Sequence, residues 1–142
     1  MGILMVIDKY KAVVDGISLL QLGDTHLTYT PSEVNTFLLL PIEHDKIRLY
    51  YEGDKVVGLI TWCWLSTTKS NLFLNDEYVP TKEDYRQDTS DDLWGMEFIA
   101  PFGHTRKMMR AIRKTTTELY GTTNQVHFRR FYNRNKLHKR MF

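Results

Sequence analysis

Residues 47–65 read IRLYYEGDKVVGLITWCWL, and this stretch decides the fold class. Two runs rich in β-branched and aromatic residues, Ile47–Tyr51 and Val56–Leu65, flank the polar turn Glu52–Lys55. Such residues favour strands, and a short turn containing Asp and Gly between two of them is typical of a β-hairpin. We therefore predict an antiparallel hairpin, with Cys63 buried in its apolar second strand as a structural residue.

Downstream of the hairpin, the sequence predicts two more strands and a helix. Residues 67–93 are polar and predict a loop, with a short helix near Thr81–Tyr85. Leu93–Ala100 and Val126–Tyr132 predict strands, and a basic tail follows the second. Between them, Thr105–Tyr120 predicts an amphipathic helix that packs on the sheet. The apolar line expected to face the sheet consists of Met108, Ile112 and Leu119.

Upstream of the hairpin, the sequence predicts two helices. Apolar residues recur every three or four positions from about Met5 to Leu22, which indicates one amphipathic helix. Thr30 followed by Pro31 is typical of a helix start, so a short helix should run to about Leu39 and stop at Pro41. Together these elements predict an α+β fold, with a twisted, mainly antiparallel sheet flanked by helices.

Length and composition limit the possible classes of protein. The chain has 142 residues, 42% of them hydrophobic, so we expect residues 1–142 to form a single domain with a real core. A single cysteine excludes an intramolecular disulfide and a cysteine-rich zinc site. No apolar run approaches the ~20 residues of a membrane span, and no leader peptide is recognisable. We therefore expect a cytoplasmic protein without a membrane span.

Charge is distributed unevenly along the chain. Residues 1–103 contain 8 basic and 16 acidic residues, whereas residues 104–142 contain 11 basic residues and one acid, Glu118. The basic third indicates an anionic partner, such as nucleic acid, an acidic protein or a phosphate-bearing cofactor, or it simply covers the acidic remainder. Residues 127–140, HFRRFYNRNKLHKR, interleave aromatic and basic side chains, as in some nucleic-acid-binding segments, but no named motif is present.

Few residues form a recognisable catalytic pattern. The sequence has neither a GxGxxG nor a GxxxxGK[ST] motif, and its five histidines share no metal-ligand spacing, so we expect no metal site. His26 lies in a polar break, where an imidazole can be exposed and titrate near neutral pH. Glu97 lies on a predicted strand, where its carboxylate is either solvated or turned inward towards a partner. From the residues alone, each of the two can have either a structural or a functional role.

Three segments resemble one known family, the RTX toxin-activating lysine acyltransferases. They are residues 62–66 (WCWLS), 74–76 (LND) and 97–103 (EFIAPFG), and Asp76 follows Ser66 by ten residues, as in the family. Further upstream, weaker matches are Gly16, Leu20, His26 and Leu40–Ile42. The order of predicted elements is also similar to the GNAT-type acyltransferase layout.

The resemblance implies a GNAT-like fold and an acyl transfer reaction. Members of the family move a fatty acyl group from the phosphopantetheine of acyl carrier protein to internal lysines of a protoxin in the cytoplasm, with no permanently bound cofactor. A normal acetyl-CoA turn is not expected, because the turn Ala100–Thr105 holds only one glycine. The family's catalytic histidine corresponds to His26, acting as base or nucleophile, and its aspartate corresponds to Glu97.

The resemblance also gives expectations for binding residues and partners. We expect Ser66, Arg106, Arg129 and Arg130 to contact the substrate or the acyl donor. The expected partners are acyl carrier protein and a lysine-bearing protein target, and a homodimer is possible. The alternative is a non-catalytic protein on the same fold, such as a small phage or mobile-element factor that contacts nucleic acid or a host protein.

Overall fold

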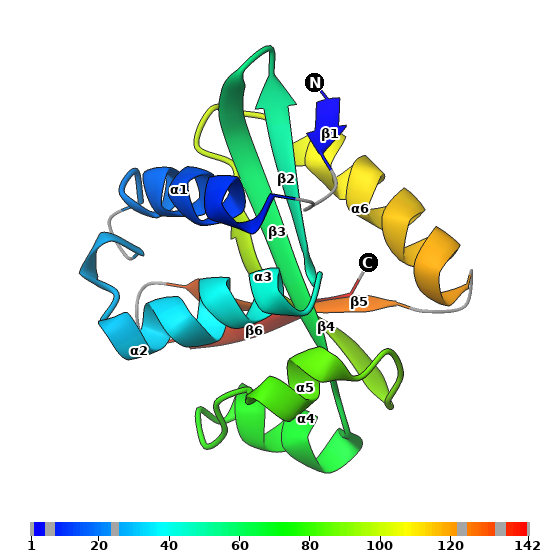
Figure 1. Cartoon of the computed structure of the whole chain (residues 1–142). Coiled ribbons are helices and arrows are strands. Elements are labelled where there is room, and N and C mark those ends of the chain that lie inside the picture. Colours follow the sequence, from blue (N-terminus) through cyan, green and yellow to red (C-terminus); the bar gives the residue numbers. More distant parts are fainter. Residues whose placement is uncertain (1, 5–7, 24–25, 122–124, 133–135, 142) are drawn as a thin grey trace.

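One mixed sheet forms the centre of the molecule (Figure 1). The computed structural model describes residues 2–4, 8–23, 26–121, 125–132 and 136–141, with the backbone alone for 2–4 and for those after 129. Within these residues the sheet has six strands in chain order. They are β1 (Gly2–Leu4), β2 (Ile47–Glu52), β3 (Lys55–Leu65), β4 (Asp92–Ile99), β5 (Val126–Tyr132) and β6 (Lys136–Met141).

Neighbouring strands are antiparallel except β4 and β5, which are parallel. The predicted hairpin is confirmed as β2–β3, and so are the two strands predicted downstream. The arrangement confirms the predicted α+β, GNAT-like fold with a mainly antiparallel sheet. Cys63 is fully buried in β3, and burial raises the pKa of its thiol well above the usual value, which fits the predicted structural role.

Helices cover both faces of the sheet (Figure 1). Alternate side chains of β3 point to opposite faces. Trp62 and Trp64 pack in the cluster that includes Met108 of α6 (Thr105–Tyr120), whereas Cys63 packs with Tyr85 of α5 (Lys82–Arg86). Helix α6 therefore covers one face, and the shorter helices cover the other. No helix within the described residues is both long enough and apolar enough to cross a bilayer.

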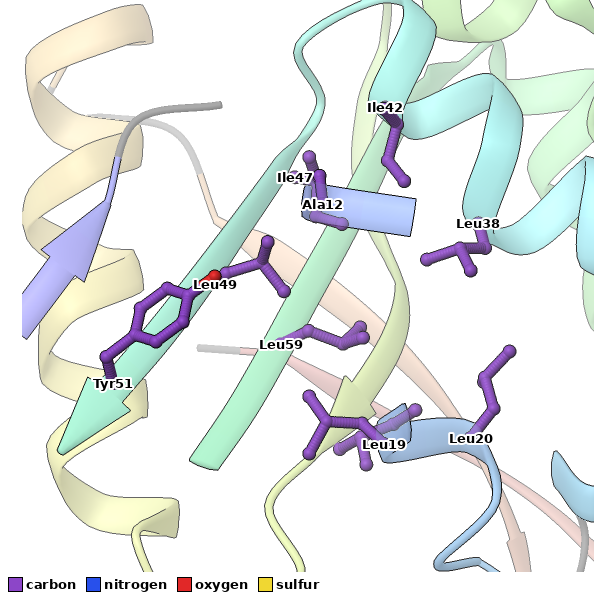
Figure 2. Packing of buried hydrophobic residues seen from close by; sticks show 10 residues of the cluster. Ala12, Leu19, Leu20, Leu38, Ile42, Ile47, Leu49, Tyr51 and Leu59 are labelled. Carbon is purple, nitrogen blue, oxygen red and sulfur yellow. The ribbon is translucent and has the colours of Figure 1, made fainter. Parts of the chain in front are cut away.

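The core between α1 (Lys9–Leu20) and the hairpin is shown in Figure 2. Ala12 and Leu19 of α1 face Leu49 of β2 and Leu59 of β3, and Leu38 joins them from the neighbouring helical segment. Each of these five side chains is at most 2% exposed. Burial of large aliphatic side chains contributes about 1.5–3 kcal/mol each, so this cluster fixes α1 against the sheet.

The first helix is shorter than predicted, and not all of its apolar residues face the core. It begins at Lys9, because the Asp8 carboxylate caps it by accepting from the Lys11 amide at 3.0 Å. Residues 5–7, where we expected its first turn, lie outside the described residues. Tyr10 and Val14 face solvent, because α1 packs against the core through the face that carries the small residues Ala12 and Gly16.

Pro41 does not end the helical segment after Thr30. Thr30 forms the predicted cap through a reciprocal pair of hydrogen bonds with Glu33, and α2 (Pro31–Val34) follows. The backbone then widens into a π-helical stretch, η2 (Asn35–Leu39), and continues as α3 (Leu40–Glu43). Pro41 lies in the first turn of α3, where a proline needs no amide donor, so the expected stop was wrong.

The region predicted as mostly loop, residues 67–93, contains a further helix, α4 (Thr67–Leu74). The Ser66 hydroxyl caps it by accepting from the Lys69 amide at 3.2 Å, and Phe73 anchors it in the core. The polar residues at its start masked this helix in the sequence. The short helix expected near Thr81–Tyr85 is confirmed as α5.

Two predictions about the C-terminal third were also wrong. In α6, Met108 and Ile112 face the sheet as expected, but Leu119 is 50% exposed. The inward line continues instead through Thr116 and Tyr120, whose hydroxyl accepts from the Trp62 indole at 2.9 Å. The segment expected to be a basic tail forms β6, which adds an antiparallel strand to β5.

Candidate active site

A cleft of about 1010 Å³ opens beside the parallel strands β4 and β5. These strands pair only between Leu93–Gly95 and Val126–Phe128, although both continue further. Gly95 makes this junction possible, because a Cβ at that position would lie 2.0 Å from the Phe128 ring. The ring therefore packs directly against the backbone of β4 and forms part of the cleft wall.

Both apolar and polar side chains line the cleft. The apolar lining comes mainly from β4, β5, η2 and the start of α6, and it includes Phe37, Met96, Phe98, Met109 and Phe128. Polar side chains come mainly from the segment around α2 and from the end of α4, and they include Thr30, Ser32, Glu33, Thr36 and Asp76. His26, Tyr29, Glu97 and Arg129 also line the cleft.

His26 and Glu97 meet in this cleft, although 71 positions separate them in the sequence. His26 Nε2 lies 2.7 Å from Glu97 Oε2. The Tyr29 hydroxyl donates a short hydrogen bond to the other carboxylate oxygen, Oε1. The Glu97 side chain is only 7% exposed, and these two donors satisfy a carboxylate that would otherwise be costly to bury. The sequence left open whether this carboxylate is solvated or turned inward, and the structure shows it turned inward towards two partners.

Local structure fixes each member of this trio. Glu97 pairs with Thr61 of β3, whose hydroxyl accepts from the Glu97 amide at 3.0 Å. His26 starts a single 3₁₀ turn, η1 (His26–Thr28), in which the Tyr29 amide donates to the His26 carbonyl. This turn brings the His26 and Tyr29 rings into an edge contact with centroids 5.2 Å apart. Both rings therefore approach the same carboxylate.

The contact with Glu97 also orients the imidazole. When Nε2–H donates to the carboxylate, Nδ1 carries the lone pair. Gly23 lies beside Nδ1, and a Cβ there would be 2.7 Å from that nitrogen. Glycine at position 23 therefore keeps space beside the nitrogen that can accept a proton.

Tyr29 remains a hydrogen-bond donor over a wide pH range. Burial raises the pKa of its hydroxyl far above the usual value, and the nearby charge of Glu97 raises it further. A protonated Tyr29 keeps the hydrogen bond that it donates to Glu97 Oε1. The carboxylate is thus held in place from both sides.

Arg129 of β5 lies in the same cleft, held by the end of α4. Its Nη1 donates to the Phe73 carbonyl at 2.7 Å and to Asp76 Oδ1 at 3.0 Å, and its guanidinium lies over the Phe73 ring. Burial lowers the pKa of Arg129 from its usual value, and the carboxylate of Asp76 opposes this effect. An arginine stays protonated despite such a shift, so the cleft holds a fixed cation.

Asp76 occupies a backbone conformation that usually favours glycine. Its φ is +61°, and it ends α4 with the Glu77 amide donating to the Leu72 carbonyl at 2.8 Å. This is the pattern of a Schellman C-cap, in which glycine is the commonest residue at the left-handed position. The carboxylate at this position holds Arg129, which is a contact that glycine cannot make.

Two other predicted binding residues, Ser66 and Arg106, do not line the cleft around His26. Ser66 caps α4 and does not line the cleft. Arg106 is exposed on the first turn of α6, next to the cleft-lining Thr105. The side chain of Arg130 lies outside the described part of the chain. Of the three whose side chains the structure describes, Arg129 alone lines the cleft.

Sequence reasoning missed two members of the site, Tyr29 and Asp76. Asp76 had a signal, because it belongs to the LND segment that carried the family resemblance. Tyr29 had none, because its approach to Glu97 depends on the turn at His26. Within the described residues, no three His, Cys, Asp or Glu side chains gather closely enough to hold a metal ion.

Comparison with known proteins places most of the chain in one family. The family model HlyC, described as the RTX toxin acyltransferase family, matches residues 7–140. That match covers the cleft, both members of the His26–Glu97 pair and Arg129. A search of curated protein sequences found no match.

Proposed function

Because the chain belongs to the RTX toxin acyltransferase family, we propose that it moves a fatty acyl group from acyl carrier protein to an internal lysine of a protein target in the cytoplasm. Membership makes the chain an acyltransferase of the toxin-activating type. The observation that carries the finer proposal is the His26–Glu97 pair, 2.7 Å apart in a cleft large enough for a substrate.

His26 acts as the general base in this proposal. A lysine attacks a thioester only as the neutral amine, so a base must take a proton from its ammonium group. Nδ1 of His26 is available for this proton when Nε2–H donates to Glu97. Glu97 fixes the tautomer and stabilises the imidazolium, and Tyr29 holds Glu97 in position.

The transfer then balances without a further reactant. The lysine Nζ attacks the thioester carbonyl, the amide C–N bond forms, and the C–S bond to the pantetheine thiol breaks. Of the two protons that the nitrogen loses, one passes through His26 to the leaving thiolate and the other goes to solvent. The apolar lining residues, such as Phe37, Phe98 and Phe128, suit the acyl chain, and Arg129 suits an anionic part of the donor.

Intact-mass analysis tests this function. The chain is incubated with acyl-loaded carrier protein and lysine-containing peptides, and the acyl mass is followed on each component. The wild type should move the acyl mass to a lysine, and His26→Ala should abolish the transfer. A stable acyl adduct on wild-type His26 would identify it as nucleophile instead of base.

The chain offers a matched control. His104 Nε2 lies 2.6 Å from Glu52 Oε1, so this pair repeats the geometry of His26 and Glu97 outside the cleft. His104→Ala should keep full transfer. Full transfer by a folded His26→Ala protein would disprove the catalytic assignment. No transfer from any acyl-carrier donor by the wild type would favour the non-catalytic alternative.

A further inference from the structure

Helix α6 carries a basic face without carboxylate partners. Five exposed cations lie on its first ten residues: Arg106, Lys107, Arg110, Arg113 and Lys114. Within the described residues, none of the five forms an ion pair. Elsewhere in the described chain, lysines such as Lys11, Lys46 and Lys69 do pair with carboxylates. The five cations therefore form no ion pair with the acidic part of the chain, although the pKa of the Glu52 carboxyl is lowered mainly by its contact with His104 and further by the nearby Lys107.

The charge on α6 also opposes its own helix dipole. The start of a helix favours acidic side chains, because the unpaired backbone N–H groups make that end positive. The first turn of α6 contains no acid, and it includes Arg106 and Lys107. His104 at the N-cap provides no side-chain cap. An external anion bound at this end would therefore stabilise the helix.

The basic face lies next to the cleft. Thr105 and Met109 line the cleft, and Arg106, Arg110 and Arg113 follow one another at helical spacing along the adjoining strip. A protein bound to this strip therefore lies beside Met109. An arm that extends from that protein can enter the cleft that His26 and Glu97 also line.

We propose that the strip of Arg106, Arg110 and Arg113 docks an acidic helix of the acyl carrier, so that its acylated arm enters the cleft past Thr105 and Met109. This inference rests on the proposed function, because it takes a carrier protein as the donor. Charge complementarity selects the partner: five unpaired cations on a convex helix suit an acidic protein surface. Docking on α6 then contributes to donor affinity and not to the chemical step.

The test compares a donor with and without its protein. A triple variant, Arg106→Glu, Arg110→Glu and Arg113→Glu, is assayed with acyl-carrier protein and with acyl-pantetheine, which has the same thioester but no protein. With the carrier, KM should rise at least tenfold while kcat changes less than twofold. With acyl-pantetheine, both constants should stay within twofold of the wild type. Raising the salt concentration should raise KM for the carrier more in the wild type than in the variant, because exposed charges are screened within ~8 Å at physiological ionic strength.

A second triple variant controls for net charge. Lys9→Glu, Lys82→Glu and Arg86→Glu change the charge equally at exposed positions that do not line the cleft. This variant should keep the wild-type KM for the carrier. The proposal is overturned by an unchanged KM in the α6 variant, by an equal loss with both donors, or by an equal loss in the control.

Direct binding separates this inference from the proposed function. Binding of holo carrier protein to His26→Ala is measured by calorimetry or fluorescence, without any turnover. Binding that the α6 changes weaken at least tenfold would support docking even if no acyl transfer occurred. If the carrier does not bind, or if an oligonucleotide binds α6 while the carrier does not, the docking proposal is wrong.

Discussion

Shortening Glu97 to aspartate tests whether the site depends on the reach of this side chain. The family resemblance alone favours Glu97→Asp, because it restores the family's residue. The geometry predicts the opposite. Glu97 contacts His26 Nε2 at 2.7 Å and also accepts from Tyr29, so its present length already meets both donors.

The size of the effect follows from one lost methylene. Removing a carbon–carbon bond of ~1.5 Å retracts the carboxylate and takes the contact with His26 beyond hydrogen-bonding distance. A misplacement of ~1 Å in a catalytic group can cost about 100-fold in rate. We therefore expect kcat to fall about 100-fold, which is about 2.7 kcal/mol of activation free energy. The Tyr29 hydroxyl also loses its partner, which costs about 1 kcal/mol of folding stability.

Single-turnover acyl transfer at saturating donor measures the rate, and urea unfolding measures the stability. The matched control is Glu52→Asp, which shortens the carboxylate side chain of the other Glu–His pair by the same methylene, and it should keep the wild-type rate. Glu97→Gln keeps the length but removes the charge, and it should retain partial activity. A wild-type or faster rate for Glu97→Asp would refute the argument that this carboxylate is placed by its length.

Three further predictions concern the stability of the fold. Asp76→Gly should leave the melting temperature unchanged or higher, because glycine suits its φ of +61°, but transfer should fall as Arg129 loses its carboxylate. In urea unfolding, Met108→Ala should cost about 2–5 kcal/mol, whereas Leu119→Ala should cost under ~0.5 kcal/mol, because the first is buried and the second is half exposed. The free energy of unfolding should fall as pH rises above about 10, because the pKa of Tyr29 is raised in the fold and the unfolded chain releases that proton first. Tyr29→Phe should reduce this alkaline slope in urea titrations at several pH values.

The sequence predicted those elements whose local pattern matches their environment. The hairpin, β4, β5 and α6 have strong periodicity or strong β-propensity, and the structure contains all of them. Helix α4 was missed because TTKSN at its start is polar, and its helical state depends on the Ser66 cap and the burial of Phe73. The break at Pro41 was wrong because a π-helical stretch places the proline in the first turn of a new segment.

The candidate site was predictable only in part for a related reason. His26 and Glu97 were identified by resemblance, and nothing in their separate surroundings indicated a contact across 71 positions. That contact depends on tertiary structure, since it needs η1 to lie over the face of the sheet to which Glu97 points. Tyr29 depends on the same placement, so no local pattern identified it.

The parallel junction between β4 and β5 connects the fold to the chemistry. Antiparallel neighbours such as β3 and β4 pair along most of their length, so the space between them is closed by backbone hydrogen bonds. At the parallel junction, pairing ends at Gly95, and Glu97 follows two residues later on the same strand. The Glu97 backbone is anchored on its paired side, where its amide donates to the Thr61 hydroxyl, while the other side of β4 borders the cleft. Glu97 therefore lies where β4 has lost its parallel partner, at a position where its side chain is buried and still lines the cleft beside His26.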